Sequence, residues 1–386
     1  MPRGCKAFGP GASARNVQNW LKPWLPNNSK FSVLLVLAGT HTAELQGISA
    51  AGSTPAARRY TAVADAELLL YGPSKRRLFP LPPLDAGVSP ALISFVAARW
   101  LGVKPFVLAV GVPQVPPFPH LRIESADLGP SACITTGKSM DKRRVISLIE
   151  KGKNIGKQLM GPLVLCECVP GGTTTAQAAL TGLGINVDGL ISSSLLRPPL
   201  DIKNSVVSSG LRASGLDSSS SPEALMAAVG DPFQPVAVGI LLGAMESHQS
   251  VFLGGGSQMI AVLSLALASL PFQLRSRLVD LVAIGTTSWL AEEVLEGAAG
   301  VLGLAGLMER ISDYYSVKPF GLSAGLRFES SNHQSLRDYE IGYVKEGVGA
   351  GVLTFLAQLH GASLQELIQL SDQACFDLQK LKDEQA

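Results

Sequence analysis

The stretch LVLCECVPGGTTTAQAAL, from Leu163 to Leu180, joins three kinds of segment in one short piece of chain. Its apolar start is too short for a helix and predicts a buried strand. Pro170 and Gly171 end that strand, and a glycine–threonine loop leads into an alanine-rich segment that predicts a helix from Ala176. A strand, a loop of small residues and a helix in this order are typical of a parallel α/β sheet.

The loop at the centre of this stretch has the composition of an anion site. Its small residues are Gly171, Gly172, Thr173, Thr174 and Thr175. Glycine lets a ligand approach the main chain, threonine hydroxyls are donors, and a helix start presents N–H groups and a positive dipole end. No lysine follows the glycines, as a P-loop requires, and the G-x-G-x-x-G spacing of dinucleotide sites is missing. The loop therefore predicts a site for the phosphate of a small molecule. The alternative is an ordinary strand-to-helix turn with threonine caps.

The same strand, small-residue loop and helix pattern recurs twice. One apolar strand at 250–253 precedes a helix that ends near Leu270, and another at 281–284 precedes an amphipathic segment, Trp289 to Leu295. The small or polar residues at these junctions are Gly254, Gly255, Gly256, Ser257 and Gln258, and then Gly285, Thr286 and Thr287. Because ligands of open α/β sheets bind at the carboxyl edge of the strands, three such loops favour a built site over three separate turns.

Composition excludes several classes of function. The chain has 386 residues, of which 46% are hydrophobic and 16% charged, so a large buried core is expected. A net charge of +2 does not favour a nucleic-acid surface. The longest apolar run, Met259 to Phe272, is shorter than the roughly 20 residues that span a bilayer, and the amino terminus lacks the apolar core of a signal peptide. We therefore expect a soluble, cytoplasmic protein without a membrane segment. The five cysteines and five histidines show no metal-ligand spacing, so neither a metal site nor a disulfide framework is expected.

The order of segments predicts the architecture. The first 30 residues are rich in Gly, Pro, Asn and Ser, and we expect a loosely docked arm with Trp20 and Trp24 as possible anchors. The run Phe31 to Gly39 is typical of a central strand. Another strand is expected at 105–110, and helices are expected at 62–70, 92–101, 139–159, 231–245, 349–359 and 363–382. This alternation predicts an α/β fold, a Rossmann-like doubly wound parallel sheet, with a smaller helical subdomain that includes the terminal helices.

Two acidic residues have glycine-rich surroundings. Glu346 lies in YVKEGVGAGVL, where Gly347 and Gly349 leave space around a carboxylate. Glu167 ends the strand before the glycine–threonine loop, where a carboxylate is costly to bury unless it is hydrogen-bonded or used. Both are candidate catalytic residues. For Glu346 the alternative is a helix-capping glutamate.

Six stretches together resemble a known family, the nicotinate-nucleotide:dimethylbenzimidazole phosphoribosyltransferases, and look closest to its cyanobacterial and archaeal branch. The resemblance covers about residues 36–359, and its stretches are GISAAGSTPAARRYTAVADAELLLYG, CECVPGGTTTAQAALTGLG, GDPFQPVAVG, GGGSQMIAVLSLA, AIGTTSWLAEE and LRDYEIGYVKEGVGAG. It implies a large nucleotide-binding domain over 31–345, a small helical domain from 1–30 and 346–386, and a homodimer.

The resemblance also implies roles for the same two acids. The family has a general base in a Glu-Gly-x-Gly stretch, which Glu346 to Gly349 matches. A second family glutamate precedes a Gly-Asn-Thr-Thr loop, as Glu167 precedes Gly171 to Thr174 here. The Asn of the better-known bacterial enzymes is replaced by Gly172, so one side-chain contact to the nucleotide is missing.

The implied reaction moves the ribosyl phosphate of nicotinate mononucleotide to an aromatic base such as 5,6-dimethylbenzimidazole, for the lower ligand of cobalamin. No cofactor is implied, and the implied partners are the nucleotide and the base. Three alternatives stay open: the same transfer to adenine or another acceptor, a non-catalytic nucleotide-binding protein of the same fold, and, least favoured, a nicotinamide-dependent oxidoreductase.

Overall fold

The computed structural model describes residues 1–27, 30–74, 77–193, 195–196, 199–217, 219–294 and 303–383. Its centre is an eight-stranded sheet in the order β1-β8-β7-β6-β5-β2-β3-β4. Neighbouring strands are parallel except at one edge, where β1 runs antiparallel to β8. The strands are β1 (Lys6–Phe8), β2 (Ser32–Ala38), β3 (Phe106–Val110), β4 (Leu121–Arg122), β5 (Leu163–Cys168), β6 (Val251–Gly254), β7 (Val282–Thr286) and β8 (Gly321–Ser323). The predicted α/β class with a mostly parallel sheet is confirmed.

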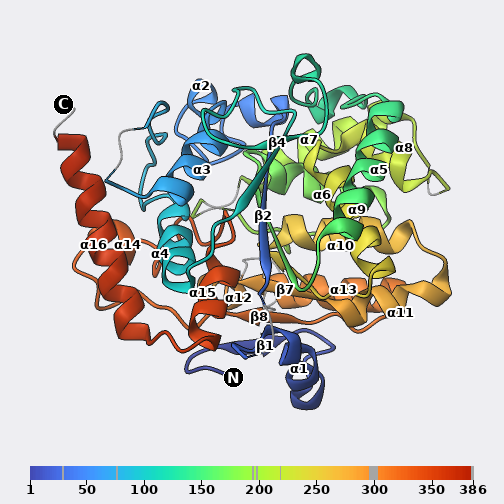
Figure 1. Cartoon of the computed structure of the whole chain (residues 1–386). Helices are drawn as coiled ribbons and strands as arrows, with labels where there is room; N and C mark the ends of the chain where they lie inside the picture. The colour runs from blue at the N-terminus through green and yellow to red at the C-terminus, as the bar shows by residue number, and fades with distance from the viewer. Residues whose placement is uncertain are drawn as a thin grey trace.

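Helices cover both faces of the sheet (Figure 1). One face carries α5 (Lys142–Gln158), α6 (Gly172–Gly182), α7 (Leu200–Ser214), α8 (Pro222–Val229), α9 (Phe233–Glu246), α10 (Ser257–Ala268), α11 (Phe272–Leu281) and α13 (Gly303–Tyr315). The other carries α1 (Ala14–Leu21), α3 (Thr61–Tyr71), α4 (Ala91–Leu101), α15 (Ala350–Leu359) and α16 (Leu364–Asp383). Shorter helices are α2 (Pro55–Arg58), α12 (Ser288–Ala291) and α14 (Gln334–Arg337), and the 3-10 turns are η1 (Lys22–Trp24), η2 (His41–Glu44), η3 (Ala126–Leu128) and η4 (Ile134–Thr136).

Strand β5 shows why both faces are buried. Its side chains alternate between the two hydrophobic clusters, so Leu163 and Leu165 pack on one side while Val164, Cys166 and Cys168 pack on the other. A strand covered on both faces is largely apolar, and in β5 the exception is Glu167 near its carboxyl end.

The helix after β5 begins earlier than the sequence predicts. We expected a loop through Thr175 and a helix from Ala176, but α6 starts at Gly172, and Gly171 precedes it with a left-handed φ of 79°. The threonines therefore form the first turn of the helix rather than a loop. The Thr175 hydroxyl donates to Gly172 O and to Asp231, which stabilises a β-branched residue at this position.

The amino-terminal segment is not a loosely docked arm, so that prediction is wrong. Residues 6–8 form an edge strand of the sheet, and α1 follows them. The Trp20 ring centroid lies 4.6 Å from that of Phe252, and the fully buried Trp24 lies 4.7 Å from the same ring. Burial of two large aromatic rings outweighs the loop-like composition around them.

The other predicted elements lie near their observed positions. The strands predicted at 31–39 and 105–110 are β2 and β3, and each predicted helix overlaps an observed one. The amphipathic segment expected at 289–295 overlaps α12 at residues 289–291, and position 295 lies outside the described residues.

The two ends of the chain contact each other. The Gln358 side chain on α15 donates to Arg3 O at 3.1 Å, and His360 lies 3.0 Å from Trp24 O. The division into a domain over 31–345 and another from 1–30 and 346–386 stays a prediction.

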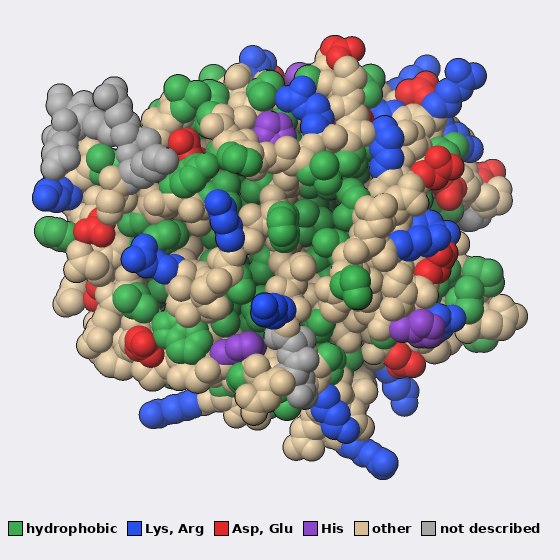
Figure 2. All heavy atoms as spheres, in the orientation of Figure 1, with side chains coloured by type: hydrophobic (Ala, Val, Ile, Leu, Met, Phe, Trp, Pro, Cys, Tyr) green, Lys and Arg blue, Asp and Glu red, His purple; other side chains and the backbone are tan. Residues whose placement is uncertain are grey.

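The surface carries both signs of charge. Figure 2 shows Lys, Arg, Asp and Glu side chains scattered over this face, with hydrophobic side chains between them. Within the described ranges, no helix combines the length and apolar character needed to cross a membrane.

Candidate functional site

The three predicted junctions lie side by side at one edge of the sheet. In the parallel register Cys166 of β5 pairs with Gly254 of β6, which pairs with Gly285 of β7. The loops that follow these strands therefore converge, as the sequence predicts.

A cavity of about 790 Å³ opens beside this edge. Seven of the predicted site residues line it: Glu167, Gly171, Gly172, Thr173, Gln258, Glu346 and Gly347. Ten do not line it and lie behind these: Thr174, Thr175, Gly254, Gly255, Gly256, Ser257, Gly285, Thr286, Thr287 and Gly349. The cavity thus brings both candidate acids to one space, whereas most of the glycine and threonine residues support its wall.

Glu346 is held by four hydrogen bonds. One carboxylate oxygen accepts from the Gly347 and Gly351 N–H groups, at 3.0 and 3.2 Å. The other accepts from Thr287 N at 2.7 Å and from the Thr286 hydroxyl at 3.0 Å. Burial raises the pKa of Glu346, while these donors act in the opposite direction. Because Gly351 lies in the first turn of α15, the carboxylate caps this helix and also faces the cavity.

The backbone around Glu346 is strained. Val344, Lys345 and Val348 have positive φ angles of 63°, 62° and 54°, and Gly349 has one of 74°. Each such non-glycine residue costs on the order of 1–3 kcal/mol. At Gly349 a side chain is excluded, because a Cβ would lie 2.2 Å from the Cys166 sulfur. Strain of this kind concentrates at functional sites and holds Glu346 in one position.

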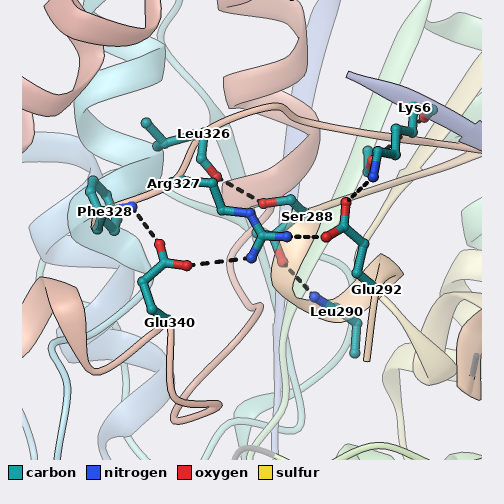
Figure 3. Close-up of polar contacts among 10 residues, drawn as sticks. Lys6, Ser288, Leu290, Glu292, Leu326, Arg327, Phe328 and Glu340 are labelled. Carbon is teal, nitrogen blue, oxygen red and sulfur yellow. Dashed lines mark hydrogen bonds and ion pairs between the residues drawn. The ribbon is translucent and has the colours of Figure 1, made fainter. Parts of the chain in front are cut away.

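A polar network joins segments that lie around the loop of Glu346, residues 344–349 (Figure 3). Arg327 pairs with both Glu292 and Glu340, and Lys6 pairs with Glu292 at 2.7 Å. The Ser288 hydroxyl donates to Leu326 O at 2.8 Å. These contacts join β1, α12 with the residue after it, the segment after β8 and the segment that leads to Glu346.

Glu167 is buried but retains free acceptor capacity. One oxygen accepts from Val169 N and the other from the Gln258 side-chain amide, both at 2.8 Å. Burial first, and then the negative charges of Asp231 and Glu346, raise the pKa of Glu167 to about 8. A carboxyl group with a pKa near physiological pH can hold or release a proton.

Gly172 leaves room for the Gln258 side chain. A Cβ at position 172 would lie 1.6 Å from Gln258 Oε1. An Asn at this position would require the flexible Gln258 side chain to move, because its amide oxygen occupies the space that a Cβ would fill.

Lys203 is a candidate that the sequence analysis missed. It lies on α7 with 0% exposure, and its ammonium group donates to Thr173 Oγ1 at 2.9 Å. Burial, followed by the charge of Lys345, lowers the pKa of Lys203 to about 8. Lys345 has its own carboxylate, Glu293, at 2.5 Å. Among the described residues no carboxylate lies within ion-pair distance of Lys203, although the charge of Glu293 acts on it. Lys203 does not itself line the cavity, and its charge would act on an anionic ligand there from beside Thr173. A single lysine in a polar helix carries no sequence signal of such burial.

Asp65 is a second missed residue. It lies on α3, is buried, lines the cavity and accepts a hydrogen bond of 2.6 Å from Ser89. Its position among the apolar residues of TAVADAELLL was an available signal, because an acid in such a run is costly to bury. Within the described part of the chain, no group of three or more His, Cys, Asp or Glu side chains could hold a metal.

The fold is that of a class of phosphoribosyltransferases. The crystal structure of nicotinate-nucleotide–dimethylbenzimidazole phosphoribosyltransferase from Thermus thermophilus is similar with a TM-score of 0.55 and 19% identity, over 87% of this chain and 85% of that one. The crystal structure of CobT from the same organism has a TM-score of 0.56 and 18% identity, over 92% and 93% of the two chains.

The chain belongs to the UPF0284 family. A UPF0284 protein of Prochlorococcus marinus is 56% identical over 378 residues, 98% of this chain and 94% of that protein. One of Parasynechococcus marenigrum is 51% identical over 98% and 95% of the two chains, and one of Picosynechococcus is 36% identical over 90% and 93%. No protein-family profile matches the chain.

Proposed function

We propose that this protein transfers the ribosyl phosphate of nicotinate mononucleotide to an aromatic nitrogen base and releases nicotinate. The observation that carries the proposal is that Glu346 and Glu167 line one cavity together with Thr173, whose hydroxyl contacts the buried Lys203. The shared fold with a phosphoribosyltransferase of this reaction supports it. The acceptor is 5,6-dimethylbenzimidazole or a related base, in the assembly of a cobalamin lower ligand.

The nucleotide phosphate binds at the end of the cavity formed by Gly171, Gly172 and Thr173. The amino terminus of α6 directs its positive dipole end there, while the N–H groups of Gly172, Thr174 and Thr175 already bond to backbone carbonyls. A phosphate beside Thr173 would pair with Lys203, and this pairing would restore the pKa of the lysine, which burial lowers.

The reaction breaks the bond between ribose C1′ and the nicotinate nitrogen and forms one between C1′ and the nitrogen of the acceptor. The acceptor loses its N–H proton to Glu346. The Thr286 hydroxyl can rotate and so vacate one acceptor position on this carboxylate, whereas the backbone donors stay. General-base help of this kind contributes about 10²- to 10⁴-fold. Glu167 is largely protonated at neutral pH in the free protein, and it stabilises the positive charge that develops at C1′ once it has ionised beside the cationic nucleotide.

A second candidate is a nucleotide-binding protein without turnover. The four donors on Glu346 favour it, because they fill the carboxylate and give it a capping role on α15. The homodimer also stays a prediction, which sedimentation of the purified chain tests.

Release of nicotinate separates the two candidates. The full chain is incubated with nicotinate mononucleotide and a panel of bases, and free nicotinate is measured by chromatography. The transferase releases nicotinate only when an acceptor is present and forms an equal amount of ribosylated base. If the chain binds nicotinate mononucleotide but no base causes the release of nicotinate, the nucleotide-binding protein without turnover is favoured.

A further inference from the structure

The cavity extends beyond the proposed nucleotide end into a second, more apolar part. Its wall there contains Leu81, Pro82, Pro83, Val88 and Pro90. Prolines and aliphatic side chains of this kind suit the faces of a flat aromatic ring. Asp65 is a buried ionisable group of this wall, with Ser89 and the buried Cys168 beside it. The positive charge of Arg77 also acts on Asp65.

The segment 87–90 is fixed against the loop of Glu346. Tyr339 donates to Val88 O at 2.8 Å, and Gly87 N donates to Asp338 at 2.8 Å. A Cβ at Gly347 would lie 2.8 Å from Pro90 Cγ. Since Pro90 lies against the residue after Glu346, and Ser89 bonds to Asp65, both carboxylates border the space around the Ser89–Pro90 turn.

Asp65 has unused acceptor capacity. One of its oxygens accepts from the Ser89 hydroxyl at 2.6 Å, and the other has only the weak thiol donor of Cys168 at 3.7 Å. A carboxylate has about four acceptor positions. Within the described ranges no further hydrogen-bond donor contacts it, so a ligand N–H that entered this part of the cavity would find an acceptor.

We propose that Asp65 and Ser89 select the acceptor base, and that the preferred acceptor is a bicyclic aromatic base with an N–H donor on the edge opposite the ribosylated nitrogen. The inference rests on the proposed function, because it places the ring N–H of the base at Glu346 while the other ring nitrogen attacks C1′. One edge of the base then gives its proton to Glu346 while the opposite edge donates to Asp65.

This arrangement discriminates against purely apolar bases. An apolar substituent facing Asp65 would displace water and leave one carboxylate oxygen with the weak thiol donor of Cys168 alone. Sites built to bond an N–H reject analogues that lack it far more strongly than apolar pockets reject an extra methylene. A dimethyl-substituted base would therefore be a poorer acceptor than one with an amino group.

Two bases of nearly equal shape test the inference. The affinities of 5-aminobenzimidazole and 5-methylbenzimidazole for the full chain are measured by calorimetry, with and without inorganic phosphate to fill the nucleotide end. The amino compound should bind about 10- to 100-fold more tightly, the range for a hydrogen bond to a charged group. Equal affinities, a preference for the methyl compound, or binding of neither base would overturn the inference.

Variants test whether Asp65 causes the preference for the amino compound. Asp65→Val removes the acceptor and should abolish the preference, and Asp65→Asn, which keeps the shape, should reduce it several-fold if the valine variant does not fold. Glu67→Gln is the matched control, since Glu67 is also buried on α3 but does not line the cavity, and it should keep the preference. A preference that persists without the Asp65 carboxylate would contradict the assignment.

The ratio of the affinities for the amino and methyl compounds can be measured whether or not the chain releases nicotinate. If the chain prefers the amino compound but releases no nicotinate with any base, the proposed transfer fails and the base site stands. If nicotinate is released but the two bases bind equally, the transfer stands and the role of Asp65 fails.

Discussion

The side-chain amide of Gln258 donates a hydrogen bond of 2.8 Å to Glu167, and its oxygen occupies the space in front of Gly172. One side chain thereby joins two of the predicted junctions. Gln258, at the start of the helix after β6, positions Glu167 near the end of β5. The absence of a side chain at position 172 is what permits this contact.

A double-mutant cycle tests this relationship. Gly172→Ala should displace Gln258 from Glu167 and lower kcat/KM for nicotinate release by about 10-fold or more, because neighbouring residues couple by roughly 0.5–3 kcal/mol. In a Gln258→Ala background the same substitution should have little further effect, since the obstructing oxygen is gone. Additive effects of the two changes would mean that Gly172 is needed for another reason.

Removal of the buried Lys203 ammonium group should weaken nucleotide binding without lowering the stability of the fold. Lys203→Met should raise the KM for nicotinate mononucleotide by about 10- to 100-fold, the range for hydrogen bonds to charged groups. The melting temperature should stay the same or rise, because burial of an unpaired charge is unfavourable. Lys153→Met, at an exposed lysine of α5, is the control for loss of charge. An unaltered KM would remove Lys203 from the nucleotide site.

The two candidate acids could be predicted from the sequence, whereas Lys203 and Asp65 were missed. Glu346 and Glu167 are flagged by local features, namely flanking glycines and the end of a strand. Burial of Lys203 depends on how α7 packs beside Thr173, and the pattern of its own helix does not reveal this, because the adjacent Ile202 is exposed. The sequence named Trp20 as an anchor but did not reveal how firmly the first 30 residues dock, because its partners Phe252 and Phe320 are distant in sequence.

The pH dependence of stability should report Glu167. Its pKa is raised from 4.5 to about 8, mainly by burial, so the folded state binds more protons than the unfolded state between these values. The stability contribution of this group is therefore present below pH 4.5 and is lost as pH rises through 8. Glu167→Gln cannot ionise and should melt roughly 2–3 °C above the wild type at pH 8, the effect of about 2 kcal/mol on a chain of this length.

The difference between Glu167→Gln and the wild type should shrink toward pH 5. Glu346, Asp65 and Asp231 also have raised pKa values in both proteins. The difference therefore reports Glu167 together with its charge coupling to Asp231 and Glu346. A gap in melting temperature that does not change with pH would show that Glu167 has an ordinary pKa.

Activity should survive removal of divalent metals. The leaving group is nicotinate rather than pyrophosphate, so no polyphosphate charge has to be neutralised by Mg²⁺. Nicotinate release is measured after exhaustive EDTA treatment, before and after addition of Mg²⁺ or Zn²⁺. Loss of activity that either ion restores would contradict a mechanism that uses side chains alone.

The kcat of nicotinate release by Glu346→Gln tests the central claim most directly. The variant keeps the size of the side chain but cannot take the proton of the acceptor. Part of its four-donor contact is also lost, so a lower melting temperature is expected in either case and does not discriminate. As general base, Glu346 predicts a fall in kcat of about 10²-fold or more with little change in nucleotide affinity. A folded Glu346→Gln protein with near-normal kcat would contradict the account and leave Glu346 as a helix cap alone.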